Sequence, residues 1–187
     1  MVAEDQTQRA SELTREGQNL LEAGNHQLAL EKFIEAADLL GRMSDLEKQA
    51  HLFSNIGLIE SEMGQNESAL SHFRRSLGLF EGMGNKLHMA QQWGNLGSTY
   101  RNMQAWDLAM DAYFEALPLY EELGHSMGIG DQYTNMAYVH SMRGKLDKAL
   151  ELYQKALPLY TEAGDGRRIH LTQKNINTLQ SQISGKN

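Results

Sequence analysis

The sequence predicts an all-α fold made of four copies of a two-helix unit. One set of residue types returns every 40 residues along the chain. Within each copy the apolar residues recur at spacings of three and four, which is typical of amphipathic helices. Only two prolines interrupt the 187 residues, and no segment alternates apolar and polar residues as a half-buried strand does. These three observations favour a helical repeat array, in which each unit packs on the next.

The 40-residue register holds at four kinds of position without an insertion. A helical bundle without internal repeats would not show four kinds of residue that all recur at the same 40-residue spacing. We therefore expect units at residues 11–50, 51–90, 91–130 and 131–170, followed by a closing helix at 171–183. The positions are a small residue (Gly17, Gly57, Gly97, Ala137), an alanine (Ala29, Ala69, Ala109, Ala149), a large ring (Phe33, Phe73, Tyr113, Tyr153) and a second apolar residue (Leu13, Phe53, Trp93, Tyr133).

In the first two units a glycine separates the two expected helices. Gly24 and Gly64 each follow an apolar stripe, and glycine suits the left-handed turn that ends a helix. The second helix of each unit then carries a ring, Phe33 or Phe73. We expect each ring to fill the space opposite the small residue of the preceding helix.

The third unit shows the same plan with one change. Trp93, Leu96 and Tyr100 follow helical spacing, and Gln104 then stands where the other units place the glycine. A second apolar stripe covers residues 108–120. The unit is therefore expected to keep the turn without its usual glycine.

The fourth unit repeats the plan, and the closing helix is expected to cap the array. Gly144 marks its inner turn and Gly164 its exit. The closing helix is largely polar, as the outer face of a terminal repeat must be. The basic cluster at residues 166–170 is interpreted as a solvated loop, because it is too short to form a nucleic-acid face.

The motif Trp93-x-x-Leu96-Gly97-x-x-Tyr100, followed by Ala109-x-x-x-Tyr113, resembles the tetratricopeptide signature. The resemblance implies a right-handed α-solenoid of four helix-turn-helix repeats with a C-terminal capping helix. The usual repeat is about 34 residues long, so these units are longer. In that respect they are similar to the repeats of Pins-type polarity adaptors, kinesin light chain and bacterial peptide-sensing regulators.

Composition excludes several classes of function. The net charge of −7 and the sequence pI of about 5.5 disfavour a nucleic-acid partner. The absence of cysteine excludes disulfides and thiolate chemistry. No segment approaches the roughly 18 apolar residues of a membrane-spanning helix, and residues 1–15 do not resemble a secretory signal. The expected location is the cytoplasm, with no membrane partner.

The sequence contains no recognisable catalytic constellation. The seven histidines form no two-histidine metal motif, and there is no phosphate loop or nucleophile elbow. We therefore predict no enzyme activity, no cofactor and no metal. Glu60 and His140 stand at a position that is apolar in the other units, and either a satisfied buried side chain or a titrating functional group explains them.

An asparagine recurs on the outer stripe of the first helix in units two to four and in the closing helix. In relatives of this family the stripe lines a concave groove, and a ladder of asparagines holds an extended peptide. An amide offers donors and an acceptor, so it can bind a peptide backbone whatever the peptide's sequence. The alternatives are a relic of duplication or hydrogen bonds between neighbouring helices. The predicted ladder is Asn55, Asn95, Asn135 and Asn175.

The neighbours of the ladder are expected to supply specificity. Arg15 replaces the asparagine in unit one and offers a charge to a peptide carboxylate. The other predicted groove residues are His51, Leu58, Gln91, Ser98, Arg101, Asn102, Asp131, Tyr138 and Met142.

The predicted function is an adaptor, scaffold or assembly factor that binds an extended or helical peptide segment of another protein. The expected state is a monomer, with a weak homo-oligomer as the alternative. The alternatives are a structural solenoid that self-associates and a sensor of a short signalling peptide.

Overall fold

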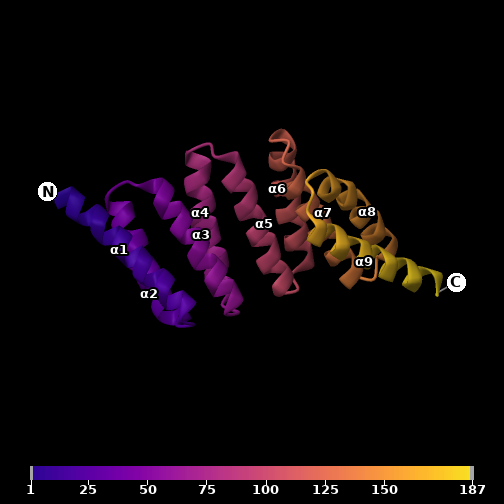
Figure 1. Ribbon diagram of the computed structural model, residues 1–187, viewed down its shortest axis with the longest axis horizontal. Coiled ribbons are helices and arrows are strands. Elements are labelled where there is room, and N and C mark those ends of the chain that lie inside the picture. Colours follow the sequence, from indigo (N-terminus) through magenta and orange to yellow (C-terminus); the bar gives the residue numbers. More distant parts are fainter. Residues whose placement is uncertain (1, 186–187) are drawn as a thin grey trace. The chain divides into compact units, whose positions relative to one another are not determined.

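The computed structural model describes residues 2–185, with side chains from residue 5 onward. Within these residues all regular secondary structure is α-helical (Figure 1). The helices are α1 (Val2–Glu22), α2 (His26–Arg42), α3 (Leu46–Glu62), α4 (Asn66–Gly82), α5 (Lys86–Asn102), α6 (Trp106–Glu122), α7 (Ser126–Met142), α8 (Leu146–Glu162) and α9 (Gly166–Ser184).

The predicted 40-residue period is confirmed by the helix boundaries. The helices α3, α5, α7 and α9 begin at residues 46, 86, 126 and 166, and each is followed by a tight turn or a chain end. The expected unit limits at residues 51, 91 and 131 fall inside α3, α5 and α7. The closing helix expected at 171–183 is α9, which begins five residues earlier, at Gly166.

The turns between helices place one residue in the left-handed region of backbone conformation. Glycine occupies most of these positions, for example Gly64 with a φ of 75°. Gln104 adopts the same conformation with a φ of 59°, and Ser44 with a φ of 58°. The turn geometry is therefore kept even where the sequence lacks the glycine that would adopt it without strain.

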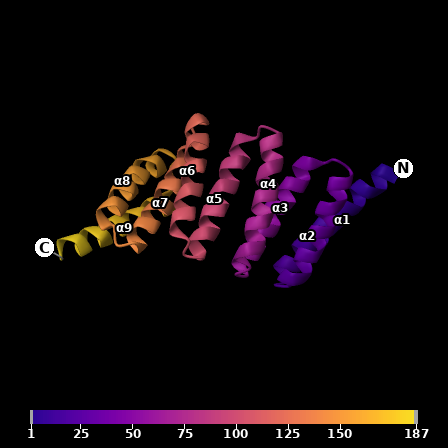
Figure 2. The ribbon, with the colours of Figure 1, turned by 180° about the vertical axis from the view of Figure 1, so that it is seen from behind.

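The chain forms two compact units, residues 1–88 and residues 89–187. In the first unit α1 to α4 follow one another as antiparallel neighbours (Figure 2). The buried core of this unit includes Leu13, Phe33 and Phe53. A Cβ at Gly57 would lie 2.7 Å from the Phe73 ring, so the predicted pairing of a small residue with a ring is present here.

The second unit contains most of α5 and the helices α6 to α9. Tyr113 on α6 is fully buried, and its ring lies so close to Gly97 on α5 that a Cβ there would meet it at 2.4 Å. Further along the unit, Ala137 on α7 and Tyr153 on α8 belong to one buried cluster with Ile176 of α9. The same small-to-large packing therefore recurs in both units.

The four residues of the second apolar series differ in their burial. Leu13 and Phe53 are buried, whereas Trp93 and Tyr133 keep part of their surface exposed. Large amphipathic rings are seldom buried completely.

Candidate functional site

Two neighbouring hollows on one face of the second unit form the candidate site. The Gln132 hollow, of about 240 Å³, is lined by residues of α5 and α7 and by Tyr120. The Arg101 hollow, of about 250 Å³, is lined by residues of α5, α7, α8 and α9. Both hollows share Asp131, Thr134 and Asn135. We refer to the two hollows together as the groove.

The groove side chains converge because of helical spacing. On α7, Thr134 and Asn135 follow Asp131 by three and four residues and precede Tyr138 by four and three. All four side chains therefore project from the same side of the helix. Gly94 on α5 contributes no side chain to the Gln132 hollow, and a Cβ there would meet only the Gln132 amide, at 3.6 Å. The hollow is therefore open in part because residue 94 is glycine.

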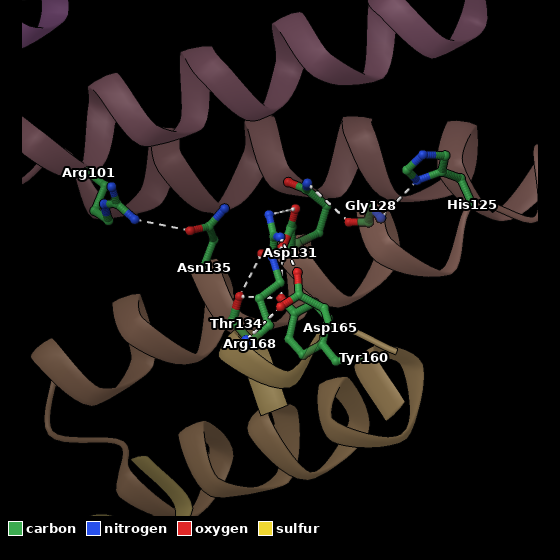
Figure 3. A network of polar contacts seen from close by, with 10 residues as sticks. Arg101, His125, Gly128, Asp131, Thr134, Asn135, Tyr160, Asp165 and Arg168 are labelled. Atoms are coloured by element: carbon green, nitrogen blue, oxygen red, sulfur yellow. Dashed lines mark hydrogen bonds and ion pairs between the residues drawn. The ribbon is translucent and has the colours of Figure 1, made fainter. Parts of the chain in front are cut away.

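An ion pair joins α9 to the centre of the groove (Figure 3). Arg168 donates from Nε to Oδ1 of Asp131 at 2.9 Å and from Nη2 to Oδ2 at 3.2 Å. The Tyr160 hydroxyl donates to the same Oδ1 at 2.8 Å. Arg168 Nη1 also donates to Asp165, 2.8 Å away, which caps α9. Both oxygens of Asp131 are therefore engaged.

Burial shifts the titration of two tyrosines in this unit. It raises the pKa of Tyr120 to about 12, and the negative charge of Asp131 acts in the same direction. Burial also raises the pKa of Tyr160 above its ordinary value. Both phenols are neutral near pH 7, so Tyr160 acts as a hydrogen-bond donor to Asp131 and not as a charge.

Asn135 and Arg101 are paired across the groove. Arg101 Nη1 on α5 donates to Oδ1 of Asn135 on α7 at 3.0 Å (Figure 3). The Arg101 guanidinium also lies 5.4 Å from the centre of the Tyr138 ring. Asn135 therefore takes part in a hydrogen bond between neighbouring helices, which is one of the two alternatives to peptide binding. The Nδ2 amide of Asn135 still points to no acceptor within residues 5–185.

The other predicted ladder residues differ in their surroundings. Asn95 donates only a long, 3.5 Å bond to Gln92, one turn earlier on its own helix. Asn175 is exposed and lines the Arg101 hollow. Asn55, in the first unit, is exposed beside a separate hollow of about 200 Å³. The side-chain amides of these three asparagines therefore have three different environments in the described structure.

Eight predicted site residues line the groove of the second unit. Asn102 and Met142 are exposed on the same helices but line neither hollow. The eight are Gln91, Asn95, Ser98, Arg101, Asp131, Asn135, Tyr138 and Asn175.

The first unit brings fewer of the predicted residues together. His51 lines the same hollow as Asn55, above the apolar side chains of Leu40 and Leu52. The His51 ring also lies against Phe80 and His88, at centroid distances of 5.1 and 4.6 Å. Burial lowers the pKa of His88, and the neighbouring His51 contributes in the same direction.

Two further predicted residues of the first unit lie apart from that hollow. Arg15 borders another surface depression, beside Glu12. Leu58 is exposed and lines neither depression.

Sequence reasoning missed several groove residues, and Arg168 is the most important. The interpretation of residues 166–170 as a solvated loop is wrong, because they form the first turn of α9 and Arg168 is paired with Asp131. The N-capping residue Asp165, three positions before Arg168, is the signal that marks this helix start. Gly94, Gln132 and Thr134 were also missed, and no pattern at the level of the sequence singles them out.

Glu60 and His140, which break the apolar pattern, have different environments. Glu60 is buried, accepts a 2.6 Å hydrogen bond from Ser68 and lies 2.7 Å from Nδ1 of His72. It is therefore a satisfied buried side chain. His140 is half-buried, and its Nδ1 has no hydrogen-bond partner among the described residues. Burial lowers the pKa of His140, with smaller contributions from Lys145, Lys148 and Arg143.

Neither a metal site nor a membrane-spanning helix is found among the described residues. No group of three or more His, Cys, Asp or Glu side chains in this part of the chain is arranged to hold a metal ion. None of the helices described above combines the length and apolar character that crossing a bilayer requires.

Comparison with known proteins identifies the repeat. Residues 88–162 match the family model for the tetratricopeptide repeat. This part of the chain consists of tetratricopeptide repeats. The predicted resemblance, based on Trp93, Gly97 and Tyr113, is thereby confirmed. No curated protein sequence matches the chain.

Solved structures extend the likeness to the fold of nearly the whole chain. The apo form of RapI is similar with a TM-score of 0.84 and 13% identity, over 92% of this chain and 48% of that one. Aspartyl phosphate phosphatase F from Bacillus subtilis is similar with a TM-score of 0.80 and 16% identity, over 96% of this chain and 50% of that one. The chain thus spans about half the length of these structures. At such low identity the likeness shows the fold alone, a solenoid of helical hairpins.

Proposed function

We propose that the groove of the second unit binds a segment of another protein, and that the chain acts as an adaptor or assembly factor. The observation that carries the proposal is the pair of hollows that share Asp131, Thr134 and Asn135 on α7. Together the two hollows extend from α5 and α7 to α9. Tetratricopeptide repeats are generally protein-interaction modules, which supports the same function.

The polar character of the Gln132 hollow suits the backbone of an extended peptide. Its lining includes the amides of Asn95, Gln132 and Asn135, and the Ser98 hydroxyl. The Oε1 of Gln132 is buried and has no hydrogen-bond partner in the described part of the chain. An unpaired buried acceptor costs about 1–3 kcal/mol. A rotation of the Gln132 side chain that let a peptide N–H bind this oxygen would remove that cost.

The Arg101 hollow has a more apolar border and suits a side chain of the same peptide. Tyr138 and Leu171 are exposed there, on α7 and α9 respectively. A strand rises about 3.3 Å per residue and packed helices lie about 8–10 Å apart. A peptide of a few residues would therefore pass from one hollow to the next.

The proposal assigns no catalytic residue, metal or cofactor to the chain. The phosphatase activity in the name of one structural neighbour belongs to that protein. We also expect the chain to be a monomer in the cytoplasm. Light scattering tests the oligomeric state, and a stable dimer would favour the self-associating alternative.

The test of the proposal fills the Gln132 hollow. Gly94→Leu places a side chain in this hollow, whereas Gly78→Leu places the same side chain on α4, where a Cβ meets no atom within 4 Å. Both changes replace a helical glycine with a better helix former. The parent and both variants are immobilised and exposed to one pool of random peptides, and the retained peptides are quantified by mass spectrometry.

The parent and Gly78→Leu are expected to retain the same peptides, and Gly94→Leu to retain few of them. Circular dichroism confirms that each variant is folded. A folded Gly94→Leu variant that retains the parent's peptides would show that the groove is not the binding site.

A further inference from the structure

The Arg101 side chain carries a positive charge that no carboxylate of the described chain neutralises. Its recorded contacts are the hydrogen bond to Oδ1 of Asn135 and the approach to the Tyr138 ring. The other two charged residues that line the Arg101 hollow, Asp131 and Arg168, pair with each other. Asp165, which lies outside the hollow, also pairs with Arg168. Among the charged residues that line the hollow, Arg101 is therefore the one without an oppositely charged partner.

The hydrogen-bonding groups that Arg101 and Asn135 leave unused are donors. A guanidinium has five N–H donors and no acceptor, and a single one of them is used, by Asn135. This bond also fixes the orientation of the Asn135 amide, because its oxygen must face the guanidinium. The Nδ2 donors of Asn135 then remain available in the groove.

Most N–H donors of Arg101 are free to bind a ligand, because its aromatic neighbour is not a hydrogen-bond acceptor for them. Tyr138 lies on one side of the guanidinium, 5.4 Å from ring centre to Cζ. Carboxylates bind arginine in the plane of the guanidinium, through parallel N–H···O bonds. The contact with Tyr138 is made through the face of the ring, which accepts no N–H···O bond and so does not compete for those donors.

We propose that the Arg101 hollow is a subsite for an acidic side chain, Asp or Glu, of the peptide that the groove binds. The inference rests on the proposed function of the groove and names the chemistry of its ligand. Arg101 and the Nδ2 of Asn135 would donate to the two carboxylate oxygens. We assign the carboxylate to a side chain and not to the end of the peptide, because the lining continues on both sides of Asn135, into the Gln132 hollow and to Leu171 and Asn175 on α9.

The experiment uses pools of acetylated and amidated peptides with one fixed central position. That position is Glu in one pool and Gln in the other, and every other position is a random uncharged residue. A third pool has Gln at the centre and a free C-terminal carboxylate. The full-length chain and its variants are immobilised, and retention is quantified by mass spectrometry.

The parent is expected to retain the Glu pool about tenfold more strongly than the amidated Gln pool, as a charge-assisted hydrogen bond implies. Arg101→Gln should bring this ratio close to one, and Arg101→Lys should restore part of it. Arg143→Gln is the matched control, because Arg143 is already paired with Asp107 and does not line the hollow. The ratio should also fall at high ionic strength.

The outcomes separate this inference from the proposed function. Retention of the Glu and Gln pools to the same extent would overturn the acidic subsite and leave peptide binding intact. A preference that survives Arg101→Gln in a folded variant, or one for the free-acid pool alone, would also overturn it. If the parent retains no pool and no member of the random peptide set, the proposed function fails and the subsite fails with it.

Discussion

Arg168 on α9 and Asp131 on α7 form a two-pronged ion pair, with N–O distances of 2.9 and 3.2 Å. The pair joins the closing helix to a residue that lines both hollows of the groove. The side chains are 42% and 36% exposed, so solvent screens much of their attraction. The pair therefore orients α9 beside the groove more than it stabilises the fold.

A double-mutant cycle tests this view of the ion pair. We expect the coupling between Asp131→Asn and Arg168→Gln to be about 0.5–1 kcal/mol in the free energy of unfolding, as for partly exposed pairs of good geometry. Urea denaturation at low and high salt measures the coupling. A coupling of several kcal/mol that is insensitive to salt would mean that the pair is a major part of the folded unit's stability.

Two glycines on α5 have different surroundings, and we expect replacement by alanine to change the free energy of unfolding in opposite directions. A Cβ at Gly97 would lie 2.4 Å from the Tyr113 ring, whereas a Cβ at Gly94 would lie at an ordinary 3.6 Å from Gln132. We expect Gly97→Ala to lower the free energy of unfolding by about 1–3 kcal/mol through overpacking. Gly94→Ala should raise it by up to about 1 kcal/mol, because alanine is the better helix former. Thermal and urea denaturation measure both, and equal effects would contradict the packing scheme.

The backbone strain at Gln104, in the turn between α5 and α6, can be relieved by a substitution. Gln104 has a φ of 59°, a conformation that most side chains disfavour. Gln104→Gly is expected to raise the free energy of unfolding by about 0.5–1 kcal/mol, with part of the gain offset by the flexibility of glycine in the unfolded chain. Gly64→Ala, at a φ of 75°, is the reverse change and should be destabilising. A Gln104→Gly variant that melts at a lower temperature would show that the glutamine side chain stabilises the turn.

The raised pKa of Tyr120 predicts that the folded chain loses stability at alkaline pH. Its pKa of about 12 in the folded chain exceeds the ordinary value of about 10. The unfolded chain therefore ionises first as the pH rises, so the stabilisation is complete below about pH 10 and is lost towards the folded pKa of about 12. Tyr120→Phe should be less sensitive to pH in this range, as followed by denaturant midpoints. An identical alkaline decline in both proteins would assign the effect to other groups.

The sequence predicted the repeat and the helix pairs well because both follow from local spacing. Helix periodicity, the Gly97–Tyr113 packing and the left-handed turn at residue 104 are each encoded within a short stretch of chain. The contacts of the groove depend instead on residues far apart in sequence. Asp131 and Arg168 are 37 positions apart, and nothing in the local pattern shows that they pair. For the same reason the sequence identified both Asn135 and Arg101 as groove residues but did not show that they bond to each other.

The most direct test of the central claim is the affinity of the folded chain for a peptide selected by the groove. Asn95→Ala combined with Asn135→Ala removes two amides of the ladder, and calorimetry measures the dissociation constant of the selected peptide. Glu67→Ala, an exposed change on α4, is the control and should bind as the parent does. We predict a loss of about tenfold to over a thousandfold for the double variant, because two peptide groups would lose partners worth about 1–3 kcal/mol each. A folded double variant that binds the peptide as tightly as the parent would contradict the assignment of these amides to peptide binding.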